Sequence, residues 1–295
     1  MNLTEQRVHE GDISGSSFSF PGRVEITGSV RAGAVVHAGG DIVIRGSVEA
    51  GLVESSGGGV YIDGEIHGPG AVVRAFGDVK ARVIRDAEVE SLASVYVPDM
   101  IFRSAVRARN LIEMKDGDGI VEASYAEAGM EITIRSAGSV SSGMDPTTLV
   151  LENFRQKELF ELSMIYEQRL TQKTARIAEL EKVISVIRIL GGRIVNLDPA
   201  KKADLALKVK EYQELKQQVV EILRERDLVV VEREKSGGKM RSITSSGDVF
   251  SGVEVRIDNA RVVVNRRYKN VIFYKSGIVI IGDLDAFMQR KRLSN

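Results

Sequence analysis

The chain has 295 residues, and its 41 lysines and arginines are balanced by 41 aspartates and glutamates. It contains no cysteine, which excludes disulfides, thiolate metal sites and cysteine nucleophiles. No apolar run approaches the length of a membrane-spanning helix, and residues 1–20 lack the basic start and apolar core of a secretion signal. We therefore expect a cytoplasmic protein without a membrane span.

Charge is unevenly distributed along the chain. Residues 1–147 contain 13 basic and 21 acidic side chains, whereas residues 239–295 contain 11 and 5. A basic cluster of this size is more typical of a solvated face, or of a contact with the acidic part of the chain, than of nucleic-acid binding. No nucleic-acid partner is expected. The cluster consists of Arg266, Arg267, Lys269, Arg290, Lys291 and Arg292.

A short pattern recurs near the start of the chain with a period of 18 residues. Its three copies occupy residues 22–30, 40–48 and 58–66. Apolar and polar residues alternate in each copy, as on a β-strand, and glycines follow where the chain must turn. The pattern predicts a β-solenoid, in which each turn rises by about 4.8 Å and equivalent side chains stack into ladders. The residues expected on the inner face are Val24, Ile26, Ile42, Ile44, Val60 and Ile62.

The spacing loosens after the third copy. The next apolar pairs begin at Val79, Val95, Ile112 and Ile132, between 16 and 20 residues apart. A left-handed solenoid of hexapeptides needs a strict period of six, which the first copies alone would satisfy. The later drift, together with two inward residues in each strand, favours a right-handed parallel β-helix over residues 1–147.

Residues 148–238 follow a helical pattern. Apolar residues recur at intervals of three and four, without Gly or Pro as far as Leu190, which predicts a long helix with a heptad seam. Gly191-Gly192 ends this helix, and Asp198-Pro199 begins a second one with an N-cap acid and a proline at the first position. The short link makes the helices antiparallel, so we expect an inserted α-helical coiled-coil hairpin that projects from the solenoid. The first seam consists of Leu159, Leu162, Tyr166, Leu170, Ile177, Leu180, Ile184 and Ile187, and the second of Leu205, Lys208, Tyr212, Leu215, Val219, Ile222, Arg226 and Val229.

Strand patterns return after the hairpin, over residues 253–257, 262–264, 271–273 and 278–280. A sheet of this size is marginal by itself, so residues 239–295 are expected to cap or flank the solenoid.

Residue types that carry chemistry are few and scattered. His37 and His67 lie 30 residues apart, out of phase with the repeat, so they are not expected to share a ladder or a metal; the third histidine is His9. The segment 116–119 lacks the ligand spacing of an EF-hand, and 57–59 lacks the Lys-Ser or Lys-Thr of a phosphate loop, so both are expected to form turns.

Three aspartates in or near strands could suggest a carbohydrate-cleaving solenoid. Asp41, Asp63 and Asp78 do not share one spacing, however, and their positions in the ladders explain them without chemistry. We expect no catalytic residue, no metal site and no cofactor.

The chain resembles the bacterial flagellar assembly protein A family. The resemblance rests on the Gly-Asp-Ile/Val starts at residues 11–13, 40–42 and 77–79, on the stretches 79–89 and 101–108, and on the helical insertion followed by Ser251-Gly252-Val253-Glu254-Val255. It implies a non-enzymatic bacterial protein linked to flagellar or cell-pole assembly, with no catalytic residues.

We expect a scaffold or adaptor that presents the hairpin to protein partners. Alternatives are a self-assembling filament former of the bactofilin kind and, less favoured, a β-helix acyltransferase or polysaccharide-active enzyme. Homo-oligomers are compatible with each of these functions. Partner binding is expected at the hairpin tip, around Arg188, Arg193, Lys201 and Lys202, where basic residues gather beside the glycines of the link.

Overall fold

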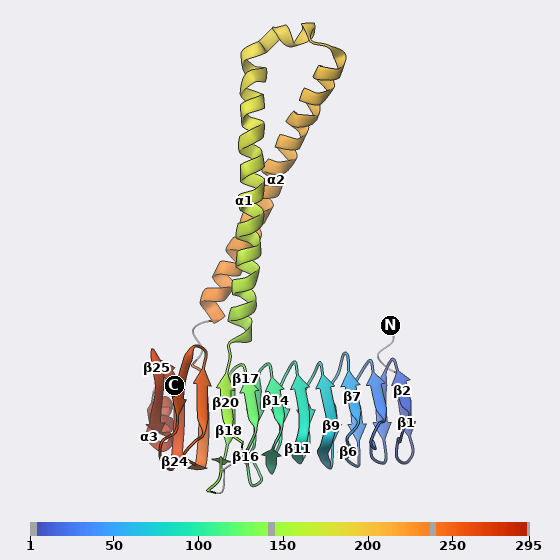
Figure 1. Cartoon of the computed structure of the whole chain (residues 1–295), viewed down its shortest axis with the longest axis vertical. Coiled ribbons are helices and arrows are strands. Elements are labelled where there is room, and N and C mark those ends of the chain that lie inside the picture. The colour runs from blue at the N-terminus through green and yellow to red at the C-terminus, as the bar shows by residue number, and fades with distance from the viewer. Residues whose placement is uncertain (1–4, 141–144, 237–239, 294–295) are drawn as a thin grey trace. The chain divides into compact units, whose positions relative to one another are not determined.

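The β-solenoid and the inserted helical hairpin are both present in the computed structural model, which describes residues 5–140, 145–236 and 240–293 (Figure 1). The chain forms two compact units, residues 1–153 with 240–295, and residues 154–239. In the first unit, strands from successive turns pair in parallel on three faces. The right-handed sense of the solenoid stays a prediction.

Each face is a stack of short strands, one from each turn. The first contains β1 (Gln6–His9), β3 (Arg23–Ile26), β5 (Ile42–Ile44), β8 (Val60–Ile62), β10 (Val79–Lys80), β12 (Val95–Tyr96), β15 (Leu111–Glu113), β18 (Glu131–Ile134) and β21 (Ser242–Val249). The second contains β2 (Ser17–Phe20), β4 (Val35–Ala38), β7 (Leu52–Ser55), β9 (Glu65–Ala75), β11 (Val83–Ser91), β14 (Ala105–Ala108), β17 (Tyr125–Ala128), β20 (Thr148–Leu151) and β22 (Glu254–Ile257). The third contains β6 (Val48–Glu49), the first parts of β9 and β11, β13 (Met100–Phe102), β16 (Ile120–Glu122) and β19 (Ser136–Ala137).

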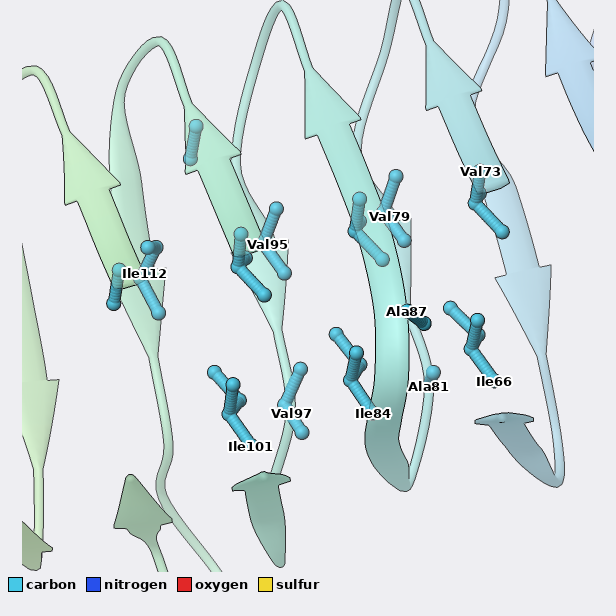
Figure 2. Packing of buried hydrophobic residues seen from close by; sticks show 14 of the residues in the cluster. Ile66, Val73, Val79, Ala81, Ile84, Ala87, Val95, Val97, Ile101 and Ile112 are labelled. Carbon is cyan, nitrogen blue, oxygen red and sulfur yellow. The ribbon is translucent and has the colours of Figure 1, made fainter. Parts of the chain in front are cut away.

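The inward side chains form the predicted ladders. Val24 is in register with Ile42, which is in register with Val60, and all three are fully buried. The ladder continues through Val79, Val95, Ile112, Ile132 and Ile243. Figure 2 shows part of it beside a second ladder that contains Ile66, Ile84 and Ile101. The drift in spacing leaves the strand register intact because the corners absorb the extra residues.

Glycines at one corner permit the close stacking of successive turns. Gly28, Gly46 and Gly64 lie above one another, and the Gly46 amide donates a hydrogen bond to the Gly28 carbonyl over 3.0 Å. A Cβ atom on Gly46 would lie 2.8 Å from that carbonyl oxygen, and one on Gly64 would lie 2.7 Å from the oxygen of Gly46. The 18-residue recurrence of glycine therefore reflects backbone packed on backbone.

The segment after the hairpin continues the solenoid and then reverses direction. Strands β21 and β22 add parallel pairings to β18 and β20. Next, β23 (Ala260–Val263) pairs antiparallel with β22, and β24 (Tyr268–Ser276) pairs antiparallel with β21 and β25 (Ile278–Asp283). The chain then forms α3 (Leu284–Leu293). The antiparallel strands thus occupy the edges that β21 and β22 would otherwise expose.

The second unit consists of α1 (Phe154–Leu190), the 3₁₀ helix η1 (Gly191–Asn196) and α2 (Pro199–Ser236). Polar contacts join the helices in antiparallel order, including Arg155 with Glu232 and Arg176 with Glu211. Figure 1 shows the helices crossing and then separating toward η1. Among its described residues, the buried side chains are Leu159, Leu170 and Leu180 on α1 and Ile222 and Val229 on α2.

Two details of the hairpin differ from the sequence expectation. Residues 148–151 form the solenoid strand β20 instead of the start of the helix, because all four side chains are buried in a strand paired on both sides. Leu162 does not belong to the seam and is 37% exposed, whereas Ser163 is half-buried on the seam side of α1. Side chains three or four residues apart lie on the same face of an α-helix, and Leu159, Ser163, Tyr166 and Leu170 have this spacing on the face of α1 toward α2.

Candidate functional site

The aspartates that begin the turns are used by the backbone of the solenoid. Asp12 accepts a hydrogen bond from the Ser29 amide over 2.7 Å, and Asp41 accepts one from the Gly59 amide over 2.8 Å. Asp78 accepts the corresponding bond from Ser94 over 3.1 Å. These carboxylates therefore satisfy corner amides one turn further along the chain.

The three histidines lie at separate positions in the solenoid. His37 Nδ1 lies 3.3 Å from a Glu54 carboxylate oxygen, and His67 Nε2 lies 3.8 Å from Glu49. His9 contacts the edge of the Phe18 ring. Within the described ranges, no group of three or more His, Asp or Glu side chains is arranged to hold a metal ion.

The two loops that resemble ligand-binding motifs are corners of the solenoid. A Cβ on Gly117 would lie 2.5 Å from the Pro98 carbonyl oxygen, so this glycine is needed where two turns touch. In the segment 57–59, the Gly58 amide donates to the Ser55 hydroxyl over 2.9 Å. Both predictions of turn structure are confirmed.

A shallow hollow of about 650 Å³ lies at the corner between the second and third faces. Asp86, Glu88 and Asp145 line it. Asp86 pairs with Arg103 at 2.7 Å, and Glu88 pairs with Arg107 at 3.5 Å. Burial, the charge of Glu127 and a hydrogen bond to Glu127 raise the pKa of Tyr125 to about 12, which keeps this phenol protonated. Tyr125 is therefore not poised to act as a general base near neutral pH.

Ion pairs between neighbouring turns cover the outer faces. Arg45 contacts Glu25 at 2.8 Å and Asp63 at 3.3 Å, one turn to each side. Arg31 bridges Asp12 and Glu49 in the same way. The hydrogen bond from the Ser29 amide, followed by the contact with Arg31, lowers the pKa of Asp12. These charges are accounted for by contacts within the solenoid.

The basic C-terminal segment also makes contacts within its own unit. Arg267 binds Asp248 through two hydrogen bonds of 2.9 and 2.6 Å, and Arg266 stacks on Tyr268. Asp258 is bound by Arg241 and Lys275; burial raises its pKa, but the two cations outweigh burial and lower it overall. The side chains of Arg290, Lys291 and Arg292 lie outside the described residues.

Polar contacts connect the two helices along the shaft, which we define as residues 154–181 and 211–236. Arg176 donates to both carboxylate oxygens of Glu211, over 2.8 and 3.1 Å. Arg226 lies 3.4 Å from Glu167, and the Tyr212 hydroxyl donates to Glu181 over 3.1 Å. The shaft contains ten basic and twelve acidic residues.

The four predicted partner-binding residues lie together at the hairpin tip, which we define as residues 182–210. Arg188 is in the last turn of α1, Arg193 is in η1, and Lys201 and Lys202 are in the first turn of α2. Lys202 is half-buried and the other three are exposed. The tip contains seven lysines and arginines and only two aspartates, so its charge is opposite in sign to that of the shaft.

The two lysines occupy positions that do not suit helix stability. The N-terminal end of a helix carries a partial positive charge, which favours acids in the first turn. The first turn of α2 contains none, and Asp198 supplies the cap, accepting a hydrogen bond from the Ala200 amide over 3.0 Å. Arg188, by contrast, suits the C-terminal end of α1. Lys201 and Lys202 therefore oppose the dipole of α2.

Sequence reasoning identified the charges of the tip and passed over the apolar residues beside them. Val186, Ile189 and Leu207 are 53%, 84% and 67% exposed. Their exposure could have been predicted from the sequence, since all three fall outside the seam positions of the two helices.

A family model for the flagellar assembly protein A β-solenoid domain matches residues 8–278, which include strands β2 to β24 and the whole hairpin. The chain belongs to the flagellar assembly protein A family. The match confirms the resemblance noted in the sequence and links the protein to flagellar assembly. Comparison with curated proteins and with solved structures finds no match. Among the described residues of this flagellar assembly protein A relative, no helix has the length and apolarity needed to cross a bilayer.

Proposed function

We propose that this protein is a non-enzymatic, cytoplasmic scaffold or adaptor in flagellar assembly, which binds protein partners through its helical hairpin. The observation that carries the proposal is the place of the insertion. In one turn of the solenoid, two residues, 129 and 130, join β17 to β18. In the next turn, the equivalent corner between β20 and β21 contains the hairpin. A two-residue link is enough to continue the solenoid, so solenoid folding does not require the insertion.

The length of the hairpin supports a binding role. Helices of 37 and 38 residues are each about 56 Å long, although only five of their described side chains are buried. We infer that partner contacts are concentrated at the tip, around Arg188, Arg193, Lys201 and Lys202. Charges in water steer association more than they add affinity, so binding should weaken as salt rises.

The adaptor function is favoured over a filament built by end-to-end stacking. Arg7 occupies an inward position of the first described turn, in register with Val24, and its guanidinium lies over the rings of Phe18 and Phe20. An inward charge at a sheet edge discourages the addition of another strand. At the other end, the edge of β21 is paired with β24. An enzymatic alternative has less support, because most of the acids named above are paired or bind backbone amides.

The test is a pull-down from extract with the full chain and a tip variant that carries Arg188→Glu, Arg193→Glu, Lys201→Glu and Lys202→Glu. The two lysine changes place acids in the first turn of α2, where they favour the helix, whereas Arg188→Glu places an acid in the last turn of α1, where it does not. Circular dichroism would therefore verify that the variant keeps its helices. A matched control reverses four exposed charges of the shaft, Lys157, Arg169, Arg224 and Lys235. The tip variant should lose partners that the control retains. Equal recovery of all partners by the two variants would contradict the proposal.

A further inference from the structure

Three exposed apolar side chains at the tip have no role in the proposed function. Val186 and Ile189 lie one turn apart on α1, and Leu207 lies on α2. Between the tip and the base of the hairpin, residues 166–185 and 208–219 contain no exposed large apolar side chain. Isolated exposed apolar residues are ordinary on a protein surface. The described shaft has exposed apolar residues too, namely Phe160, Leu162, Met164, Ile165, Val220, Leu228, Val230 and Val231. What distinguishes the three at the tip is that they lie among an excess of basic residues.

Ile189 and Leu207 face away from the space between the helices, each on the outer side of its own helix, and Val186 lies about 100° from the half-buried Ile187. On α1, Ile187 is half-buried, and Ile189 follows it by two residues, or about 200° around the helix. On α2, Leu205 is half-buried and Leu207 follows it by the same step. A flat partner surface could cover only one of these outer faces. A medium that surrounds the tip covers both.

The basic charge of the tip indicates that this medium is an anionic bilayer. The tip has seven basic and two acidic residues, whereas the shaft is slightly acidic. Basic residues interspersed with exposed aliphatic side chains are the composition of segments that adsorb to anionic bilayers, where the apolar groups enter the boundary between headgroups and acyl chains. Val186 lies four residues from the end of α1, and Leu207 lies eight residues from the start of α2. These distances correspond to about 6 and 12 Å along the helices. Val186 thus lies within the depth of that boundary, about 5–10 Å, and Leu207 lies just beyond it.

We propose that the hairpin tip docks on an anionic lipid surface. Val186, Ile189 and Leu207 enter the interfacial layer, and the surrounding basic side chains contact anionic headgroups. This docking is adsorption and does not require a membrane-spanning helix. It goes beyond the proposed function: the basic side chains of the tip serve both proposals, but the three apolar side chains take part only in lipid docking.

The test begins with vesicle flotation of the full chain. Vesicles of phosphatidylcholine with about one third phosphatidylglycerol should bind the protein, and pure phosphatidylcholine should bind it much more weakly. The variant Val186→Gln, Ile189→Gln, Leu207→Gln should partition at least about tenfold less, since it keeps the charges but removes the apolar groups. A matched control, Val220→Gln, Leu228→Gln, Val231→Gln, changes three other exposed apolar residues of the hairpin and should bind as the parent does. Glutamine has a high helix propensity, and circular dichroism would verify that both variants retain their helices.

A fluorescent reporter locates the contact. The chain has no tryptophan, so Ile189→Trp introduces a single probe, and its emission should shift to the blue with anionic vesicles. A probe at Val220→Trp should not shift.

Three results would overturn the proposal: no binding to anionic vesicles, equal binding by the tip and control variants, or loss of a pulled-down protein by the glutamine tip variant without any vesicle binding. The last result would show that the apolar residues of the tip bind a protein partner instead of lipid. Because the charge-reversal pull-down is a separate measurement, either proposal can fail alone.

Discussion

Replacing Ile44 with aspartate tests the ladder register on which the solenoid depends. Ile44 is fully buried and is in register with Ile26 on one side and Ile62 on the other. Truncating a buried isoleucine typically costs about 2–5 kcal/mol, and a buried polar group without a partner adds several more. We expect Ile44→Asp to lower the free energy of unfolding by about 5 kcal/mol or more, which is comparable to the total stability of many domains.

The assay is chemical denaturation followed by the β-sheet circular dichroism signal. Ile44→Val should cost only about 1 kcal/mol, because it removes a single methylene from the ladder. Lys80→Asp is the control for charge, since Lys80 is an exposed outward residue of β10 beside the buried Val79. Its ammonium lies over the rings of Tyr61 and Tyr96, so the change should cost no more than about 2 kcal/mol. If Ile44→Asp and Lys80→Asp unfold at the same denaturant concentration, Ile44 does not face the core and the register is wrong.

Three further predictions concern the hairpin, the glycine corner at Gly46, and the ion pairs of Asp258 with Arg241 and Lys275. Joining Leu151 to Ser242 with Gly-Met, the link used one turn earlier, should remove the helical circular dichroism signal and leave the β signal; loss of both would show a single cooperative structure. Gly46→Ala should destabilise by about 1–3 kcal/mol because its Cβ has no room, while Gly192→Ala, which meets nothing within 4 Å, should not lower the melting temperature. The lowered pKa of Asp258 means that its stabilising contribution is present above the ordinary carboxyl pKa and is lost as the pH falls through the folded value; Asp258→Asn should flatten the acid limb of a stability profile, and an unchanged limb would contradict the assignment.

Much of the architecture could be predicted from local patterns. Alternation over residues 22–30 determines which side chains of a strand point the same way, and an 18-residue period then stacks Val24, Ile42 and Val60. The ends of the helices were also predictable, since Gly191 follows α1 and the Asp198-Pro199 pair caps α2. These features depend on interactions within a few residues, or on exact recurrence.

Other features depend on partners distant in the sequence. Strand β21 has the polar sequence SITSSGDV, which lacks a strong strand pattern; it forms because β18 and β24 pair with it on either side. Residues 148–151 could continue a helix by their own composition, but β17 and β22 hold them as a strand.

The charges of the candidate site were visible in the sequence, and their surroundings were not. Their positions in the sequence place Arg188, Arg193, Lys201 and Lys202 near one another, beside the link between two predicted helices. The exposure of Ile189, which is 84%, depends on which face of α1 lies toward α2 at that point. Periodicity determines which residues share a face of a helix, but only the packing of one element on another determines which face is buried.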